Sequence, residues 1–125
     1  MLQVVDSHTI LVVEDDHNVR DITVARLEEL GYRVVEADCG AKALDLLGGD
    51  FVVDLLFTDV VMPGGINGIE LAKRARQIRP DLKVIFASGY VSSASAEEMP
   101  GPLLMKPYRD EALQGALSRM LSVVG

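Results

Sequence analysis

The stretch 55–65, LLFTDVVMPGG, joins an apolar run to an aspartate and then to a rigid turn. The run LLF is apolar on both faces, which is typical of a strand that helices cover on both sides of a sheet. Asp59 follows where this strand would end, and Pro63 with the glycines at 64–65 favours a turn just after it. A carboxylate at the end of a buried strand needs a cation, a metal ion or hydrogen bonds. The stretch therefore predicts a central parallel strand that delivers Asp59 to one edge of a sheet.

Short apolar runs of this kind alternate with helical patterns along the whole chain. The strands expected are Thr9–Glu14, Arg33–Ala37, Asp54–Thr58, Lys83–Ala87 and Leu103–Met105. The helices expected are His17–Leu30, Ala41–Leu47, Asn67–Ile78, Arg109–Val123 and a marginal, Ser-rich one at Val91–Met99. Five β-then-α units in this order predict one α/β domain, a doubly wound (βα)5 fold with a parallel five-stranded sheet and helices on both faces. In such folds, ligands bind outside the carboxyl ends of the strands.

Residues at the ends of the expected helices predict how those ends are capped. The pair Asp15-Asp16 is placed to cap the first helix at its start, and Gly31 is placed just after its end. Asp38 follows the second strand and is interpreted as the N-cap of the helix that comes next. Acidic residues at these junctions therefore have an ordinary structural explanation, against which any chemical role has to be weighed.

Length and composition limit the kinds of protein this chain can be. Its 125 residues suit one domain, with a core expected at about 9–123 and an N-terminal extension at 1–8. The apolar runs are too short to cross a bilayer, and the first residues lack the pattern of a signal peptide. Cys39 is the only cysteine, which fits a reducing cytoplasm, and the net charge of −7 argues against nucleic acid as a direct ligand. The composition thus predicts a cytoplasmic protein that contacts neither membrane nor nucleic acid.

Polar residues follow four of the expected strands at the point where each strand ends. They are Glu14 and Asp15 after the first strand, Asp59 after the third, Ser88 after the fourth and Lys106 after the fifth. Each one taken alone is compatible with a helix cap or a turn. Because the carboxyl ends of parallel strands meet at one edge of the sheet, the five side chains are expected to lie near one another. Their joint occurrence is what indicates a functional site.

Such a set of side chains permits a specific chemistry. Clustered carboxylates repel one another unless a hard divalent cation lies among them, and Mg²⁺ prefers these oxygen ligands. An aspartate beside the metal can act as a nucleophile toward an activated phosphoryl group. The charge that develops on the phosphoryl oxygens is stabilised by a metal, an ammonium and a hydroxyl placed in advance. The residues therefore point to Mg²⁺-dependent phosphoryl transfer.

The motifs LVVEDD, TDVVMPGGINGIEL, FASGY and LLMKPY resemble, in order and spacing, those of the receiver domains of two-component response regulators. The resemblance extends over nearly the whole chain and implies a flavodoxin-like sheet with strand order 2-1-3-4-5. It implies that Asp59 is the phosphoacceptor, receiving its phosphoryl group from a phosphohistidine of a histidine kinase or a phosphotransfer domain. Such a domain is a signalling switch that catalyses its own phosphorylation and dephosphorylation, and is not an enzyme acting on other substrates.

The resemblance also assigns roles around the phosphoacceptor. It implies that Asp15 and Asp59 bind Mg²⁺ directly, that Glu14 holds it largely through water, and that the Val61 carbonyl is a further ligand. Lys106 is expected to pair with Asp59 and later with the phosphoryl oxygens. The Lys106-Pro107 peptide bond is expected to be cis, as in the family.

Three positions are expected to report phosphorylation to the surface. Ser88 would turn inward to the phosphoryl group and pull on the segment that leads into the 91–99 helix. The family's aromatic switch position aligns with Leu103, which has no polar tip to move between exposed and buried states. Tyr90 is a hypothetical substitute for it. The surface made by residues 91–99, the last strand and the last helix would then bind partners, including a second copy of the chain.

Two readings compete with a phosphorylated receiver. One is a receiver-like interaction module without phosphorylation, and the other is a small metal-dependent phosphohydrolase of similar fold. The loop 62–68 is one residue longer than is usual in the family, a variant that resembles receivers found with hybrid histidine kinases. The sequence leaves open the cognate kinase, the output, and whether the chain stands alone or belongs to a larger regulator.

Overall fold

A parallel sheet forms the centre of the molecule in the computed structural model, which describes residues 8–50, 52–62, 64–89 and 101–121. Its strands are β1 (Thr9–Val13), β2 (Arg33–Ala37), β3 (Leu55–Asp59), β4 (Lys83–Ser88) and β5 (Leu103–Met105). The helices are α1 (His17–Glu29), α2 (Gly40–Leu47), α3 (Gly68–Ile78) and α5 (Asp110–Met120). All predicted strands and four predicted helices are therefore present among the described residues. β2 and β5 have the predicted ends, and the ends of the other elements differ from the prediction by at most one residue, apart from the end of α5.

The strands are hydrogen-bonded in the order β2-β1-β3-β4-β5, and every neighbouring pair is parallel. This confirms the strand order that the family resemblance implied. The apolar residues of β1, β3 and β4 are buried, as expected for strands with helices on both faces. The ladder between β3 and β4 continues to the pair Asp59–Ala87, so Asp59 is the last residue of its strand and not the first residue of the loop.

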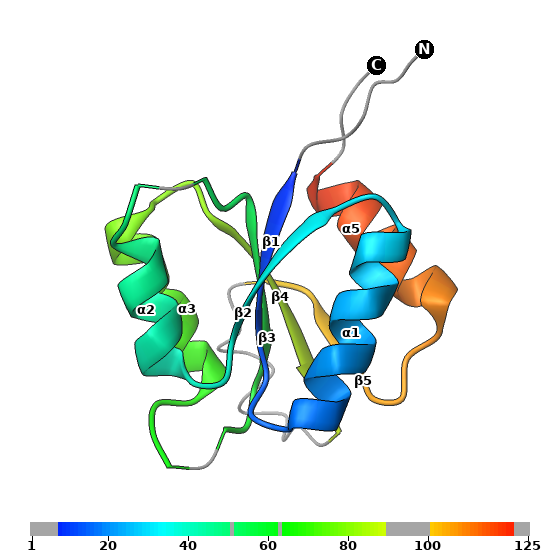
Figure 1. Ribbon diagram of the computed structural model, residues 1–125, viewed down its shortest axis with the longest axis horizontal. Helices are drawn as coiled ribbons and strands as arrows, with labels where there is room; N and C mark the ends of the chain where they lie inside the picture. The colour runs from blue at the N-terminus through cyan, green and yellow to red at the C-terminus, as the bar shows by residue number, and fades with distance from the viewer. Residues whose placement is uncertain (1–7, 51, 63, 90–100, 122–125) are drawn as a thin grey trace.

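Helices α1 and α5 cover one face of the sheet, and α2 and α3 cover the other (Figure 1). The core on the α2–α3 side includes Leu56, Leu71 and Phe86, all fully buried. The core on the α1–α5 side includes Leu55 and Leu117, also fully buried. Neighbouring strand residues therefore point to opposite faces, which explains why the apolar runs show no alternation.

The first helix has the ends that its sequence predicts. Asp16 is its N-cap, and the Asp16 side chain accepts a hydrogen bond of 3.0 Å from the Val19 N–H. Gly31 has a positive φ of 98° and donates its N–H to the Glu28 carbonyl at 3.0 Å. A glycine in this left-handed conformation is a common way to end a helix.

The predicted cap of the second helix is wrong. Cys39, not Asp38, is the N-cap of α2, and its side chain makes no capping hydrogen bond. The Asp38 carboxylate instead lies 3.4 Å from the Lys42 ammonium on the first turn of the helix. That hydrogen bond and charge lower the pKa of Asp38. A lysine four residues away therefore competes successfully with the backbone for this carboxylate.

Three predictions lie outside the described residues: the marginal helix at Val91–Met99, the position of Tyr90, and the last turn of the final helix at residues 122–123. Among the described residues, α5 ends at Met120. No described helix has the length and apolar character needed to cross a membrane.

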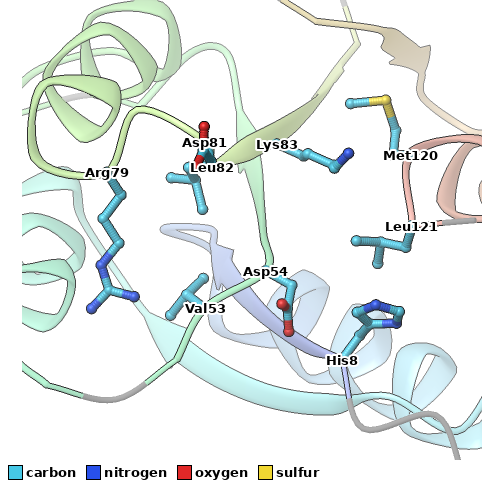
Figure 2. Close-up of a pocket in the computed structure, with 9 residues that line it drawn as sticks. All are labelled: His8, Val53, Asp54, Arg79, Asp81, Leu82, Lys83, Met120 and Leu121. Carbon is cyan, nitrogen blue, oxygen red and sulfur yellow. The ribbon is translucent and has the colours of Figure 1, made fainter. Parts of the chain in front are cut away.

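A cavity of about 400 Å³ lies at the amino-terminal edge of the sheet (Figure 2). Its lining includes His8, Asp54 and Lys83, which lie just before or at the starts of β1, β3 and β4. Parallel folds of this type bind their ligands at the opposite edge, where the strands end. The candidate functional site is therefore described at that carboxyl-terminal edge.

Candidate functional site

Hydrogen bonds and close packing from neighbouring residues fix the backbone at Asp59, at the end of β3. The Thr58 hydroxyl donates to the Asp59 carbonyl at 2.9 Å, and the Gly68 N–H donates to the Val60 carbonyl at 2.7 Å. The start of α3 packs so closely here that a Cβ at Gly68 would overlap the Asp59 carbonyl oxygen. The Asp59 side chain is 13% exposed, so the carboxylate is largely enclosed but still accessible.

Lys106 joins Asp59 to Glu14 across the edge of the sheet. Its ammonium lies 3.1 Å from the Asp59 carboxylate and 2.9 Å from that of Glu14, which is buried. The backbone N–H of Lys106 donates to the Ser88 carbonyl at 2.8 Å, which extends the pairing of β4 and β5 by one residue. The peptide bond between Lys106 and Pro107 is cis, as predicted.

The ammonium of Lys106 is stabilised in its charged form. Burial alone would lower the pKa of Lys106, but its hydrogen bonds to Glu14 and Asp59 and their negative charge outweigh burial and raise it. The lysine therefore remains a cation at neutral pH, placed between two carboxylates that would otherwise repel each other.

Glu14, Asp15 and Asp59 form an acidic cluster in which one carboxylate oxygen of each lies within 4.8 Å of the others. Glu14 is fixed further by accepting a 3.1 Å hydrogen bond from the Asp16 N–H. Partial burial, followed by a hydrogen bond with Glu14, raises the pKa of Asp15. Crowded, hard oxygen donors of this kind suit Mg²⁺, which typically takes one or two carboxylates and keeps several waters. The donor set therefore fits the metal that the sequence predicted.

Because the carboxylates of the acidic cluster are crowded, removing one negative charge should change the stability of the metal-free chain. Asp15→Asn is expected to stabilise the metal-free fold, because a carboxyl whose pKa is raised on folding costs stability once the pH exceeds that pKa. The gain should be only about 0.5–1 kcal/mol, since solvent screens this exposed side chain. Urea unfolding with a chelator measures it, and Mg²⁺ should then stabilise the wild type but not the variant. Asp45→Asn, on the exposed face of α2, is the control, and a destabilised Asp15→Asn chain would contradict the interpretation.

Ser88 and Val61 lie at or just after the strand ends at this edge, whereas Leu103 is the first residue of β5, and the roles of all three stay predictions. Ser88 ends β4 and is buried, with 2% exposure. Val61 is two residues beyond Asp59 and its side chain is 61% exposed. Leu103 is partly buried, pairs with Phe86 in the β4–β5 ladder and packs on the α2–α3 core.

The sequence did not predict a role for two residues that the structure places at the site, Arg20 and Tyr108. Arg20, on the first turn of α1, donates to the Glu14 carbonyl at 2.8 Å. The one signal in the sequence is its place in the first turn of a helix, where the dipole disfavours a cation, but this does not identify its partners. Tyr108 makes an edge contact with Phe57, with ring centroids 6.2 Å apart, and burial raises the pKa of its hydroxyl. Nothing in the sequence pattern alone singles out this aromatic pair.

Comparison with known proteins places the chain in a family. Residues 10–118 match the family described as "Response regulator receiver domain". The response regulator receiver protein CpdR of Brucella abortus is 40% identical over 116 residues, which are 90% of this chain and 95% of that protein. The sensor kinase CckA of the same organism is 39% identical over 122 residues, covering 92% of this chain and 13% of the kinase.

Solved structures agree with the sequence comparison. The receiver domain of the hybrid histidine kinase CckA has a TM-score of 0.77 and 35% identity, covering 91% of this chain and 99% of that one. The response regulator TrrA of Thermotoga maritima, solved in complex with Mg²⁺ and BeF, has a TM-score of 0.78 and 30% identity, covering 90% and 98%. The matched strand order, the acidic cluster and these relatives lead to one conclusion. The chain belongs to the response regulator receiver domain family of two-component signalling.

Proposed function

We propose that this receiver domain accepts a phosphoryl group on Asp59 from a phosphohistidine of a histidine kinase or a histidine phosphotransfer domain. The observation that carries the proposal is the Lys106 ammonium, which contacts both Asp59 and Glu14 within 3.1 Å at the edge where the acidic cluster lies. A purely structural module would have no need to hold a lysine and three carboxylates together at the ends of separate strands.

The transfer is a simple displacement at phosphorus. An Asp59 carboxylate oxygen attacks the phosphorus as the bond to the imidazole nitrogen breaks, and the imidazole leaves with the electron pair. Lys106 lies within reach to follow the charge from the carboxylate to the phosphoryl oxygens. Ser88, buried at the end of the next strand, would donate its hydroxyl to the new phosphoryl group.

The metal site of this proposal uses residues of the acidic cluster. Asp15 and Asp59 would hold Mg²⁺ directly, Glu14 largely through water, and the Val61 carbonyl would be a further ligand. When bound, Mg²⁺ would neutralise part of the charge on the transferring phosphoryl group. Asp15, exposed at the rim of the cluster, leaves a path for the ion to enter.

The output of the switch is proposed to follow from Ser88. Its movement toward the phosphoryl group would shift the segment after β4, with Tyr90 as a gate and Leu103 as a non-polar switch position. The surface of β5 and α5 is then the place for a downstream partner or a second copy of the chain. Met105, on β5, is 49% exposed and available for such a contact.

The test is labelling of the wild-type chain with phosphoramidate and Mg²⁺, followed by intact-mass measurement. A gain of a single phosphoryl group, absent when Mg²⁺ is chelated, is expected. Continuous hydrolysis of a small phosphate ester such as p-nitrophenyl phosphate would instead favour the phosphohydrolase. A chain that takes up no phosphoryl group from several donors would favour the unphosphorylated module.

The phosphodonor needs a surface on which to place its histidine beside Asp59. A groove of about 340 Å³ lies between α1 and the residues that follow β5, and it reaches the site at Lys106. Its lining includes Ile22, Thr23, Arg26, Lys106, Pro107 and Tyr108. Ile22 lies on the wall of this groove and is 56% exposed, so its apolar side chain is available for a contact. We assign this groove to an apolar helix of the protein that carries the phosphohistidine.

Ile22→Asp is expected to slow phosphotransfer from a phosphorylated histidine phosphotransfer domain by roughly 10-fold, because it places a charge in an apolar contact. Labelling by phosphoramidate, which needs no docking surface, should be unchanged. Ile78→Asp is the matched control, since Ile78 is 45% exposed but lies at the end of α3. If Ile22→Asp slowed labelling by phosphoramidate as much as transfer from the phosphotransfer domain, the variant would damage the site itself, and the assignment would be contradicted.

A further inference from the structure

Arg20 connects α1 to the segment that carries Glu14 and Asp15, two of the three residues of the acidic cluster. Its Nη1 donates to the backbone carbonyl of Glu14 at 2.8 Å, and its Nε lies 3.2 Å from the Glu36 carboxylate at the end of β2. Its Nη2 lies 3.2 Å from Nδ1 of His17. All three guanidinium nitrogens therefore have partners on different parts of the chain.

The local fold explains how the arginine reaches these partners. Side chains on a helix point back toward its N-terminus, so Arg20 runs over the first turn of α1 toward the residues that precede it. Its side chain is only 15% exposed, although Glu36 is 45% exposed. A largely enclosed arginine in the first turn, where the helix dipole disfavours a cation, indicates a position fixed by its contacts and not a solvated surface charge.

The hydrogen bond from Arg20 to the Glu14 carbonyl affects the position of Asp15 as well as that of Glu14. The Glu14 carbonyl belongs to the peptide group that leads directly into Asp15, so fixing its plane limits the backbone positions open to Asp15. The Glu14 side chain is held from the other side, by Lys106 at 2.9 Å and by the Asp16 N–H at 3.1 Å. The Glu14 N–H donates to the Ala37 carbonyl at 3.2 Å. Arg20 is thus the contact that orients the peptide between Glu14 and Asp15.

We propose that Arg20 is a positioning residue for the metal site, holding the Glu14–Asp15 peptide so that the Asp15 carboxylate stays beside Asp59. This inference rests on the proposed function, since it assigns to Asp15 a role in binding Mg²⁺. Groups that orient metal ligands through hydrogen bonds typically change metal affinity or activity by about 10–100-fold when they are removed. The guanidinium fork is required because one ammonium cannot reproduce the same set of directed hydrogen bonds.

The test measures Mg²⁺ binding by NMR, from the backbone amide signals of Asp15 and Asp16, in the folded chain. Arg20→Gln is expected to weaken Mg²⁺ binding roughly 10-fold and to slow phosphoramidate labelling by a similar factor. Arg20→Lys should recover only part of the affinity. Glu36→Gln, which keeps the contact with the Glu14 carbonyl, should have the smallest effect of these variants.

The control is Arg74→Gln, which removes an arginine 2.9 Å from Glu70 on α3, away from the loop. It should lower stability slightly and leave the Mg²⁺ affinity unchanged. If Arg20 were only a structural ion pair, Arg20→Gln would behave like this control, and the inference would be overturned. Should Arg20→Gln fail to fold, Arg20→Lys against Arg74→Lys decides in the same way. A wild-type chain that binds no Mg²⁺ would overturn the proposed function and this inference together.

Discussion

Asp59→Asn is expected to remove phosphoryl incorporation completely. The amide has nearly the same size and shape as the carboxylate, but it is neutral and a far weaker nucleophile toward phosphorus. The fold should survive, because the amide oxygen can still accept a hydrogen bond from Lys106, which lies 3.1 Å from the carboxylate. Intact-mass measurement after incubation with phosphoramidate and Mg²⁺ gives the result directly.

The control for this variant is the aspartate that directly precedes the same strand. Asp54→Asn makes the same chemical change immediately before β3, at the opposite edge of the sheet, where Asp54 accepts a hydrogen bond from the Thr9 N–H. An asparagine oxygen can keep that hydrogen bond, so this chain should be labelled like the wild type. A persistent label in Asp59→Asn would place the phosphoacceptor on another residue.

Gly68→Ala is expected to have the largest effect on stability. The added Cβ would overlap the Asp59 carbonyl oxygen and come close to the Asp59 carbonyl carbon and the Val60 Cα, none of which can rotate away as a side chain could. Relieving the overlap requires α3 to move away from β3, with a cost of roughly 3 kcal/mol, at the high end for added volume in a packed site. That is a large part of the total stability of a typical domain, about 5–15 kcal/mol. Urea unfolding monitored by circular dichroism measures the change.

Gly65→Ala is the matched control, because no atom lies within 4 Å of a Cβ at Gly65. It should leave stability unchanged or raise it by about 0.5 kcal/mol through the lower entropy of the unfolded chain. Gly68→Ala should also impair labelling under conditions where it remains folded, since the displaced backbone carries Asp59. Equal unfolding midpoints for the two variants would contradict the close contact between α3 and the end of β3.

The sheet could be predicted from the sequence because its central strands are apolar on both faces. The runs ILVV, LLF and VIF have no other simple explanation in a chain of this length. The strand order did not follow from these runs, and came only from the family resemblance. The ends of the strands are harder to predict from the sequence, because they depend on which residues pair in the hydrogen-bonded ladder. Pairing with Ala87 draws Asp59 into β3, which apolar periodicity does not show.

The candidate site could be predicted where it depends on strand ends. Lys106 and Glu14 are 92 positions apart in sequence, yet parallel strands bring their ends to one edge, where the two side chains pair. The predicted N-cap role of Asp38 is wrong because capping and an ion pair with Lys42 compete locally, and the sequence does not show which prevails. The sequence does not identify Arg20 as a site residue, because Arg20 lies on α1 and its partner Glu36 on β2, and that contact exists only after the sheet has formed.

Reduction of the phosphorylated chain with borohydride identifies which aspartate carries the phosphoryl group. Hydride from borohydride reduces the acyl phosphate of a phosphorylated aspartate to the alcohol of homoserine, with release of phosphate. The wild-type chain, labelled with phosphoramidate and Mg²⁺ and then reduced and digested, would be analysed by peptide mass spectrometry. We expect homoserine at position 59 and at no other aspartate. Homoserine at position 15 or 16, or its absence from a chain that has gained one phosphoryl group, would contradict the assignment of Asp59 as the phosphoacceptor.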